Sequence, residues 1–168
     1  MDLPTILKYG DATLMVALER VPESAREAGG VCGVWSVKEI VAHLASYEWM
    51  LVDTFRSIRG ESPTPLLEDM ARLGDAFNDV WVEQYRDKSF AETLADYHEA
   101  HAQTMALASQ FSPEQFRQNG MLPWYGDEYS VDDFVVYTFY GHKREHSAQL
   151  DVYADRLERA RDATQPKR

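Results

Sequence analysis

The chain has 168 residues, of which 45% are hydrophobic and 27% charged, values typical of a globular domain rather than of a disordered or fibrous chain. Its 17 basic and 28 acidic residues give a net charge of −11, which disfavours nucleic acids and anionic membrane surfaces as partners. The single cysteine excludes an intrachain disulfide and a cluster of thiolate metal ligands.

The sequence shows no pattern typical of a secretion signal or a membrane span. The first residues lack a basic segment followed by an apolar core, and no apolar stretch approaches the roughly 20 residues needed to cross a bilayer. We therefore expect a soluble, cytoplasmic protein that does not associate with membranes. We predict one domain over residues 1–159 and a frayed tail over residues 160–168, because the apolar pattern ends near residue 160.

Apolar residues spaced three and four apart predict helices, and proline-free stretches agree with them. The predicted segments cover residues 3–21, 40–58, 67–85, 90–111 and 131–157. Ser36, Ser89 and Ser130 each precede an acidic residue by three positions, a pattern typical of a helix start, and Ser112 before Pro113 predicts one short turn. No segment alternates like a strand, so we predict an all-α bundle.

Polar residues interrupt the apolar row of the last predicted helix. This row runs through Val135 and Thr138 to His142 and His146. Residues four apart lie on one helix face, so both imidazoles point the same way and form half of a possible metal site. The alternative is a chance pair of core histidines that are satisfied by hydrogen bonds.

A metal site needs at least one further ligand from another helix. His43 lies at the edge of the apolar row of residues 40–58, a position that suits a ligand near a pocket mouth. His98 and His101 form a competing pair, and His101 falls on an inward row, where it would be a third ligand, a supporting group or a core residue. The His-Glu-x-x-His motif and the Glu-x-x-His pairs of di-iron bundles are both absent.

Three segments together resemble a known family. The segment from Trp35 to Leu44, followed by Glu48, is similar to the second-helix signature of the DinB/YfiT-like superfamily, and residues 141–146 resemble the His-x-x-x-His of its last helix. Residues 77–107 are similar to the ClbS/DfsB and maleylpyruvate-isomerase-like branches. The three segments occur in the family's order and span most of the chain.

The resemblance implies a four-helix bundle with extra short helices in its connections, often a homodimer. It also implies a divalent metal, zinc, nickel, iron or manganese, held by His43, His142 and His146. Similar members include thiol-dependent transferases, isomerases and a hydrolase. The implied partners are therefore a small-molecule substrate and, for a transferase, a low-molecular-weight thiol.

Four further residues are candidates for the surroundings of this site. Tyr47 follows His43 by one helical turn, and core packing is the alternative to a pocket role. Glu48 is a candidate base or orienting group, although solvation of the helix surface is the expected role. His101 stays open, and Trp124 precedes the last helix, where it would line a pocket mouth or pack in a loop.

Two classes of function follow from these residues. The first is a metal-dependent enzyme that acts on a small molecule as a thiol transferase or hydrolase. The second is a non-catalytic bundle, associated with stress or with dimerisation, whose metal is structural or absent.

One glycine lies next to a candidate ligand. Gly141, next to His142, costs about 1 kcal/mol relative to alanine inside a helix, and we expect the close approach of another helix to explain it.

Overall fold

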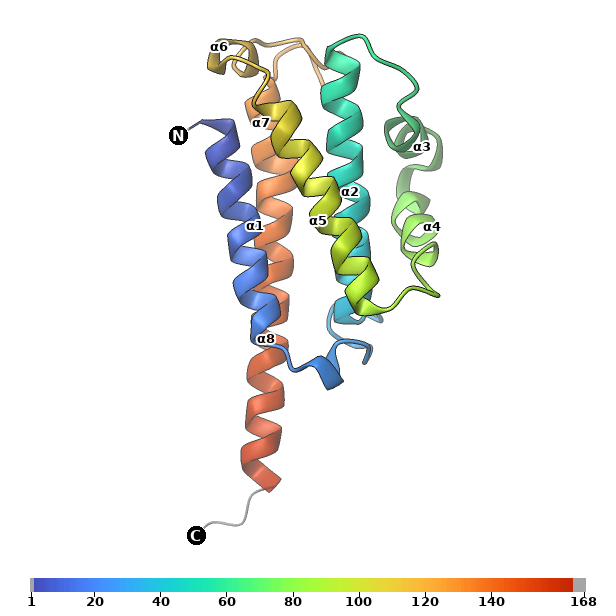
Figure 1. Cartoon of the computed structure of the whole chain (residues 1–168), viewed down its shortest axis with the longest axis vertical. Coiled ribbons are helices and arrows are strands. Elements are labelled where there is room, and N and C mark those ends of the chain that lie inside the picture. Colours follow the sequence, from blue (N-terminus) through green and yellow to red (C-terminus); the bar gives the residue numbers. More distant parts are fainter. Residues whose placement is uncertain (1, 165–168) are drawn as a thin grey trace.

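The computed structural model describes residues 2–164, and within this range it is helical without a strand. Four long helices lie side by side along the long axis of the molecule (Figure 1). They are α1 (Leu3–Glu19), α2 (Val37–Ile58), α5 (Phe90–Ala108) and α8 (Gly141–Thr164). α2 packs mainly along α5 and α8 mainly along α1, while contacts of α1 with α5 and of α2 with α8 close the ring. The predicted all-α class is confirmed.

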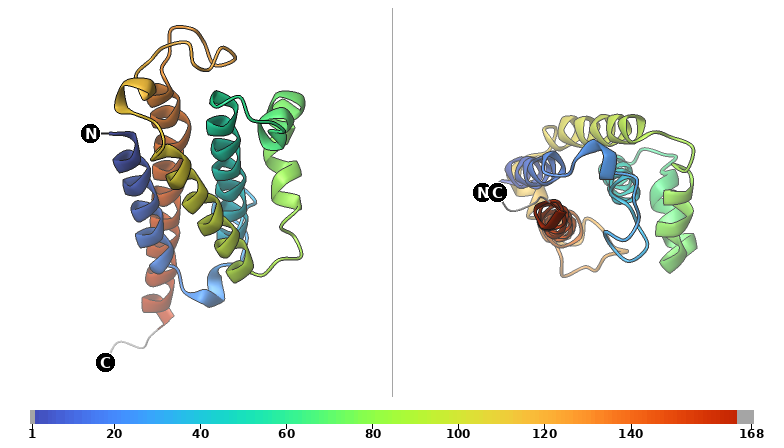
Figure 2. Two further views of the ribbon diagram at one scale, coloured as in Figure 1. Left: turned by 45° about the horizontal axis from the view of Figure 1, so that its top comes forward. Right: turned by 90° about the horizontal axis from the view of Figure 1, so that it is seen from below.

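Short elements connect the long helices. α3 (Pro65–Leu73), a 3-10 turn (Gly74–Ala76) and α4 (Phe77–Glu83) pack on the outside of α2, as the view from below in Figure 2 shows. The predicted single helix over residues 67–85 is therefore wrong. Gly74 has φ +52°, a left-handed conformation that ends α3. A 3-10 turn (Glu23–Ala25) follows α1, and α6 (Pro113–Phe116) is the predicted short turn after Ser112.

The helix starts follow the predicted serines. Ser36, Ser89, Ser112 and Ser130 each accept a hydrogen bond from the backbone N–H three residues ahead, and the side chain of that residue returns to the serine. These reciprocal contacts satisfy amide groups that have no partner inside the helix. The chain therefore fixes the beginnings of α2, α5, α6 and α7 (Val131–Val135) locally, before tertiary packing is considered.

A π-helical turn, Val136–Tyr140, joins α7 to α8 and shifts the register of the last helix. The buried row runs from Phe139 in this turn to Lys143, Ser147 and Leu150 in α8. The predicted row through Thr138 and His142 is therefore wrong, since both of these residues are only partly buried. A π turn carries one residue more than an α turn, and this extra residue rotates the following side chains.

The C-terminal end of α8 continues to Thr164, so residues 160–164 of the predicted frayed tail are helical. Residues 165–168 of that tail lie outside the described residues, and the domain boundary at residue 159 stays a prediction. Among residues 2–164, no helix combines the length and the apolar character that a membrane span requires.

The interior has two apolar clusters with polar groups between them. One cluster surrounds Phe55 and Phe139 near α6 and α7, and the other surrounds Leu14 and Leu150 toward the start of α2. The buried polar residues of α2 and α8 that lie between these clusters include His43, Glu48, Lys143 and His146. This polar layer holds the candidate functional site.

Candidate metal centre

Three histidines from two helices converge on one point. Nε2 of His43, on α2, lies 2.8 Å from Nε2 of His142, on α8, and His142 Nε2 lies 2.9 Å from Nε2 of His146. The three ligand atoms all lie within 4.8 Å of one another. The structure thus brings together all three residues that the family resemblance implies as metal ligands.

The three rings differ in burial. His43 is 3% exposed, because the rings of Trp35 and Tyr47 lie against it with centroids 4.9 Å and 4.8 Å away. The expected edge position of His43 is therefore wrong, since this ring lies in the interior. His146 is also buried, whereas His142 is partly exposed and is the ring nearest to solvent.

The surroundings keep the imidazoles neutral. Burial, followed by the neighbouring His142 and His146, lowers the pKa of His43 from 6.5 to about 2. Burial, His146 and Lys143 lower the pKa of His142 to about 4. Burial also lowers the pKa of His146, although Gln149 and Glu145 oppose this shift. All three rings therefore offer lone pairs at neutral pH, the form that binds metal ions.

One hydrogen bond fixes the orientation of His146. Its Nδ1–H donates to Oε1 of Gln149 at 2.9 Å, which leaves the lone pair of His146 on Nε2. Metal-binding histidines are commonly oriented in this way by a partner on the second ring nitrogen. Gln149 carried no sequence signal apart from its position three residues after His146.

Hydrogen bonds among the three imidazoles cannot satisfy all of their ring nitrogens. A neutral imidazole nitrogen carries either a hydrogen or an in-plane lone pair, so His142 Nε2 makes a linear hydrogen bond to only one of its two neighbours. Nδ1 of His43 is buried without a hydrogen-bond partner among the described residues. A cation between the three Nε2 atoms accepts all three lone pairs, and tetrahedral ligands about 2.0–2.1 Å from a metal lie about 3.3 Å apart, close to the separations of 2.8 and 2.9 Å found here. The donor set therefore fits a divalent metal ion.

A surface hollow of about 310 Å³ opens beside His142. Tyr47 lines it from α2, while Tyr137 and Thr138 of the π turn, Gly141 and Glu145 line it from the last helix. At Gly141 an added Cβ would meet only the Val136 oxygen at 3.4 Å, so the expected close approach of another helix is wrong there. The close approach occurs at Gly10 of α1, where a Cβ would lie 3.3 Å from the Tyr140 ring.

Glu48 and His101 lie apart from the three histidines. Glu48 is 0% exposed and pairs with Lys143, so the expected role in solvating the helix surface is wrong. His101 Nδ1 donates to Glu48 Oε2 at 3.2 Å, which makes His101 a partner of Glu48 rather than a member of the three-histidine group. His98 is exposed on α5.

Trp124 lies on a different hollow from His142. It is 52% exposed, contacts the Phe134 ring edge to face and lines an apolar hollow with Leu67 and Met70 of α3. The loop before α7 carries its indole over α3, which a sequence pattern gives no means to foresee. Trp124 therefore makes no contact with the histidine site.

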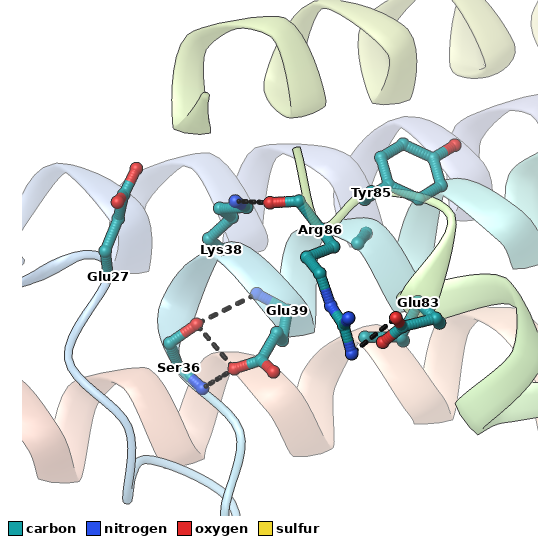
Figure 3. Close-up of a pocket in the computed structure, with 9 residues that line it drawn as sticks. Glu27, Ser36, Lys38, Glu39, Glu83, Tyr85 and Arg86 are labelled. Atoms are coloured by element: carbon teal, nitrogen blue, oxygen red, sulfur yellow. Dashed lines mark hydrogen bonds and ion pairs between the residues drawn. The ribbon is translucent and has the colours of Figure 1, made fainter. Parts of the chain in front are cut away.

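Another hollow, of about 290 Å³, lies between the start of α2 and the end of α4 (Figure 3). Several of its charged side chains have partners: Arg86 pairs with Glu83 at 2.5 Å, and Lys38 Nζ donates to the Arg86 carbonyl oxygen at 2.9 Å. Glu39 is held by the Ser36 cap. This pairing leaves the histidine site as the better candidate for chemistry.

One of three comparisons with known proteins finds a match, at the level of a superfamily. Neither a curated protein nor a solved structure matches the chain. The family model described as the DinB superfamily matches residues 9–150, a range that includes His43, His142 and His146. The chain belongs to the DinB superfamily.

Proposed function

We propose that the protein is a divalent-metal-dependent enzyme that acts on a small molecule, with His43, His142 and His146 as the metal ligands. The observation that carries this proposal is the convergence of three neutral imidazoles beside an open hollow at His142. Three protein ligands with one side open to solvent are typical of catalytic metal sites, whereas structural sites are closed by four.

The chemistry of the proposed site is that of an activated nucleophile. A divalent cation held by three neutral ligands keeps its full charge and lowers the pKa of a bound water or thiol toward neutrality, which supports hydrolysis or thiol transfer. We therefore propose a hydrolase or a transferase that uses a low-molecular-weight thiol. Imidazole ligands suit zinc, nickel and iron, and manganese completes the set of candidate metals.

The proposed site has one side covered by aromatic side chains and one side open to solvent. Trp35 and Tyr47 cover His43 and keep water from that side. The hollow beside His142 is the proposed route for the substrate. Burial raises the pKa of Tyr47, so its hydroxyl stays protonated and is suited to donate a hydrogen bond to a substrate in this hollow.

Elemental analysis of untagged protein tests the metal site. We expect one metal ion per chain in the wild-type protein and loss of that metal in the double variant His142→Ala, His146→Ala, with helical circular dichroism retained. Equal metal content in both proteins would exclude the site.

A second measurement tests the enzymatic role. We expect the visible spectrum of the cobalt-loaded protein to change on addition of a small thiol, because a catalytic site keeps a position open to an outside ligand. A spectrum that no added thiol changes, with four protein ligands on the metal, would favour a structural ion in a non-catalytic bundle.

Three finer features of the proposal come from the family resemblance. We propose membership in the ClbS/DfsB or maleylpyruvate-isomerase-like branch, a homodimeric state and a cytoplasmic location. Light scattering on the eluting protein tests the dimer, and a mass equal to one chain would exclude it.

A further inference from the structure

The interior of the bundle contains a pair of opposite charges that the proposed chemistry does not use. Glu48 is 0% and Lys143 is 3% exposed, and Lys143 Nζ lies 2.5 Å from Glu48 Oε1. Burial by itself would raise the pKa of Glu48, but Lys143 and His101 outweigh burial and lower this pKa. Well-packed apolar residues in place of a buried ion pair are often as stable, so stability alone is a weak reason for this pair.

The position of the pair links it to the histidines. Lys143 directly follows His142 on α8, and Glu48 lies five residues after His43 on α2, about 7.5 Å further along the helix axis. α2 packs mainly on α5 and α8 mainly on α1, so His43 and the other two histidines belong to different helix pairs. The ion pair is a direct contact across the boundary that the metal ligands also span.

Further side chains hold the carboxylate of Glu48 in place. Its Oε1 faces Lys143, and its Oε2 accepts the hydrogen bond from His101 Nδ1 at 3.2 Å. His101 Nε2 lies 3.9 Å from Oδ2 of Asp11 on α1, and the Tyr97 hydroxyl donates to Asp11 Oδ1 at 3.0 Å. The network thus includes all four long helices and leaves Glu48 little freedom to turn.

We propose that Glu48 and Lys143 are positioning residues for the three-histidine site, with His101 as their support. The ion pair sets the spacing of α2 and α8, and thereby the distance of His43 from His142 and His146. This inference rests on the proposed metal site. It states that residues outside the ligand set hold the three histidines at the distances that metal binding requires.

Cobalt(II) binding to the full chain tests this role, because the absorption spectrum of cobalt reports the arrangement of its ligands. The double variant Glu48→Gln, Lys143→Met removes both charges and keeps the side-chain volumes. We expect it to bind cobalt about 10–100-fold more weakly, the loss usual for residues that orient metal ligands, with an altered visible spectrum. We expect its unfolding temperature without metal to stay within a few degrees of the wild type.

Variants of His101 give an independent measurement at a residue whose side chain is 13% exposed. His101→Leu removes the second contact to Glu48 and should also weaken cobalt binding. His101→Gln restores a donor to Glu48 and should recover the affinity. If the double variant does not fold, this pair of variants decides the question.

A matched control breaks an ion pair outside the polar layer. Arg20→Gln, at the residue that follows α1, removes the contacts with Asp151 and Asp155 on α8, and cobalt affinity should stay at the wild-type value. Wild-type affinity and spectrum in both the double variant and His101→Leu would overturn the positioning role while the metal site stands. A loss of affinity that Arg20→Gln shares would also overturn it. A wild-type protein that binds no cobalt would instead exclude the proposed function itself.

Discussion

Gln149 decides which nitrogen of His146 faces the other two histidines. Its amide oxygen accepts Nδ1–H of His146, so the lone pair stays on Nε2. Replacement by leucine removes this constraint, and we expect Gln149→Leu to weaken metal binding about 10–100-fold with the fold intact. Competition with a chelator measures the affinity. Gln103→Leu, which removes a contact with Glu99 within α5, is the control, and equal affinities of the two variants would contradict the role of Gln149.

The lowered pKa values of His43 and His142 predict a pH-dependent stability of the metal-free protein. An unfolded histidine gains a proton below about pH 6.5, whereas these rings have pKa values of about 2 and about 4 in the fold. The unfolded state therefore binds more protons, and the free energy of unfolding falls as the pH falls. We expect a loss of up to about 1 kcal/mol per pH unit and ring between about pH 6.5 and pH 5.

Urea unfolding in the presence of a chelator measures this slope. His142→Gln should flatten it, because the variant has one fewer histidine that gains a proton only on unfolding. Gln103→Leu, which changes no titratable group, should leave the slope unchanged. Equal slopes in the wild type and in His142→Gln would show that His142 gains protons equally in both states.

The sequence predicted some residues of the site and not others, for physical reasons. Two histidines four apart on a helix must share a face, so His142 and His146 were recognisable from spacing alone. His43 was a candidate from its place in the apolar row, but only the family resemblance selected it over His101, because its distance from α8 arises only in the fold. Glu48 was a candidate orienting group but was expected at the helix surface, and Lys143 was missed, because a single charged side chain normally favours solvent and its burial depends on a partner far away in the chain.

At the scale of elements, the helix starts were predictable and the interior register was not. A serine and an acidic residue three positions later act within one helical turn, so a short pattern suffices to place the start of α2 or α5. The π turn at Val136–Tyr140 has no such local pattern, and it moves Lys143 into the buried row in place of His142. Gly74 similarly divides a helix that its apolar spacing predicts as continuous.

The packing of α1 against the last helix predicts opposite effects at two glycines. A Cβ at Gly10 would lie 3.3 Å from Tyr140 Cδ2 and 3.4 Å from Lys143 Cδ, so Gly10→Val should destabilise the protein by about 1–3 kcal/mol. Gly141→Ala meets only the Val136 oxygen at 3.4 Å and should be neutral or stabilising by up to about 1 kcal/mol. Thermal unfolding measures both, and the reverse order would place the tight contact at Gly141.

At the scale of the whole molecule, the net charge of −11 predicts how stability depends on salt. Repulsion among excess acidic groups opposes the compact state, and added salt screens it. We expect the unfolding temperature to rise as the ionic strength increases from about 0.01 M to about 0.2 M. Exposed ion pairs such as Arg20 with Asp151 are weakened by salt but contribute little. A falling unfolding temperature would mean that these pairs outweigh the repulsion.

His43 and His142 are 99 positions apart in the chain, although their ring nitrogens lie 2.8 Å apart in the fold. A denatured polypeptide rarely closes so long a loop, and it offers an ion at most His142 and His146, which are neighbours in the sequence. A bound metal would therefore select the native state, adding about 2.7 kcal/mol when its concentration is a hundred times the dissociation constant. The availability of that ion in the cell would then govern how long each molecule survives proteolysis.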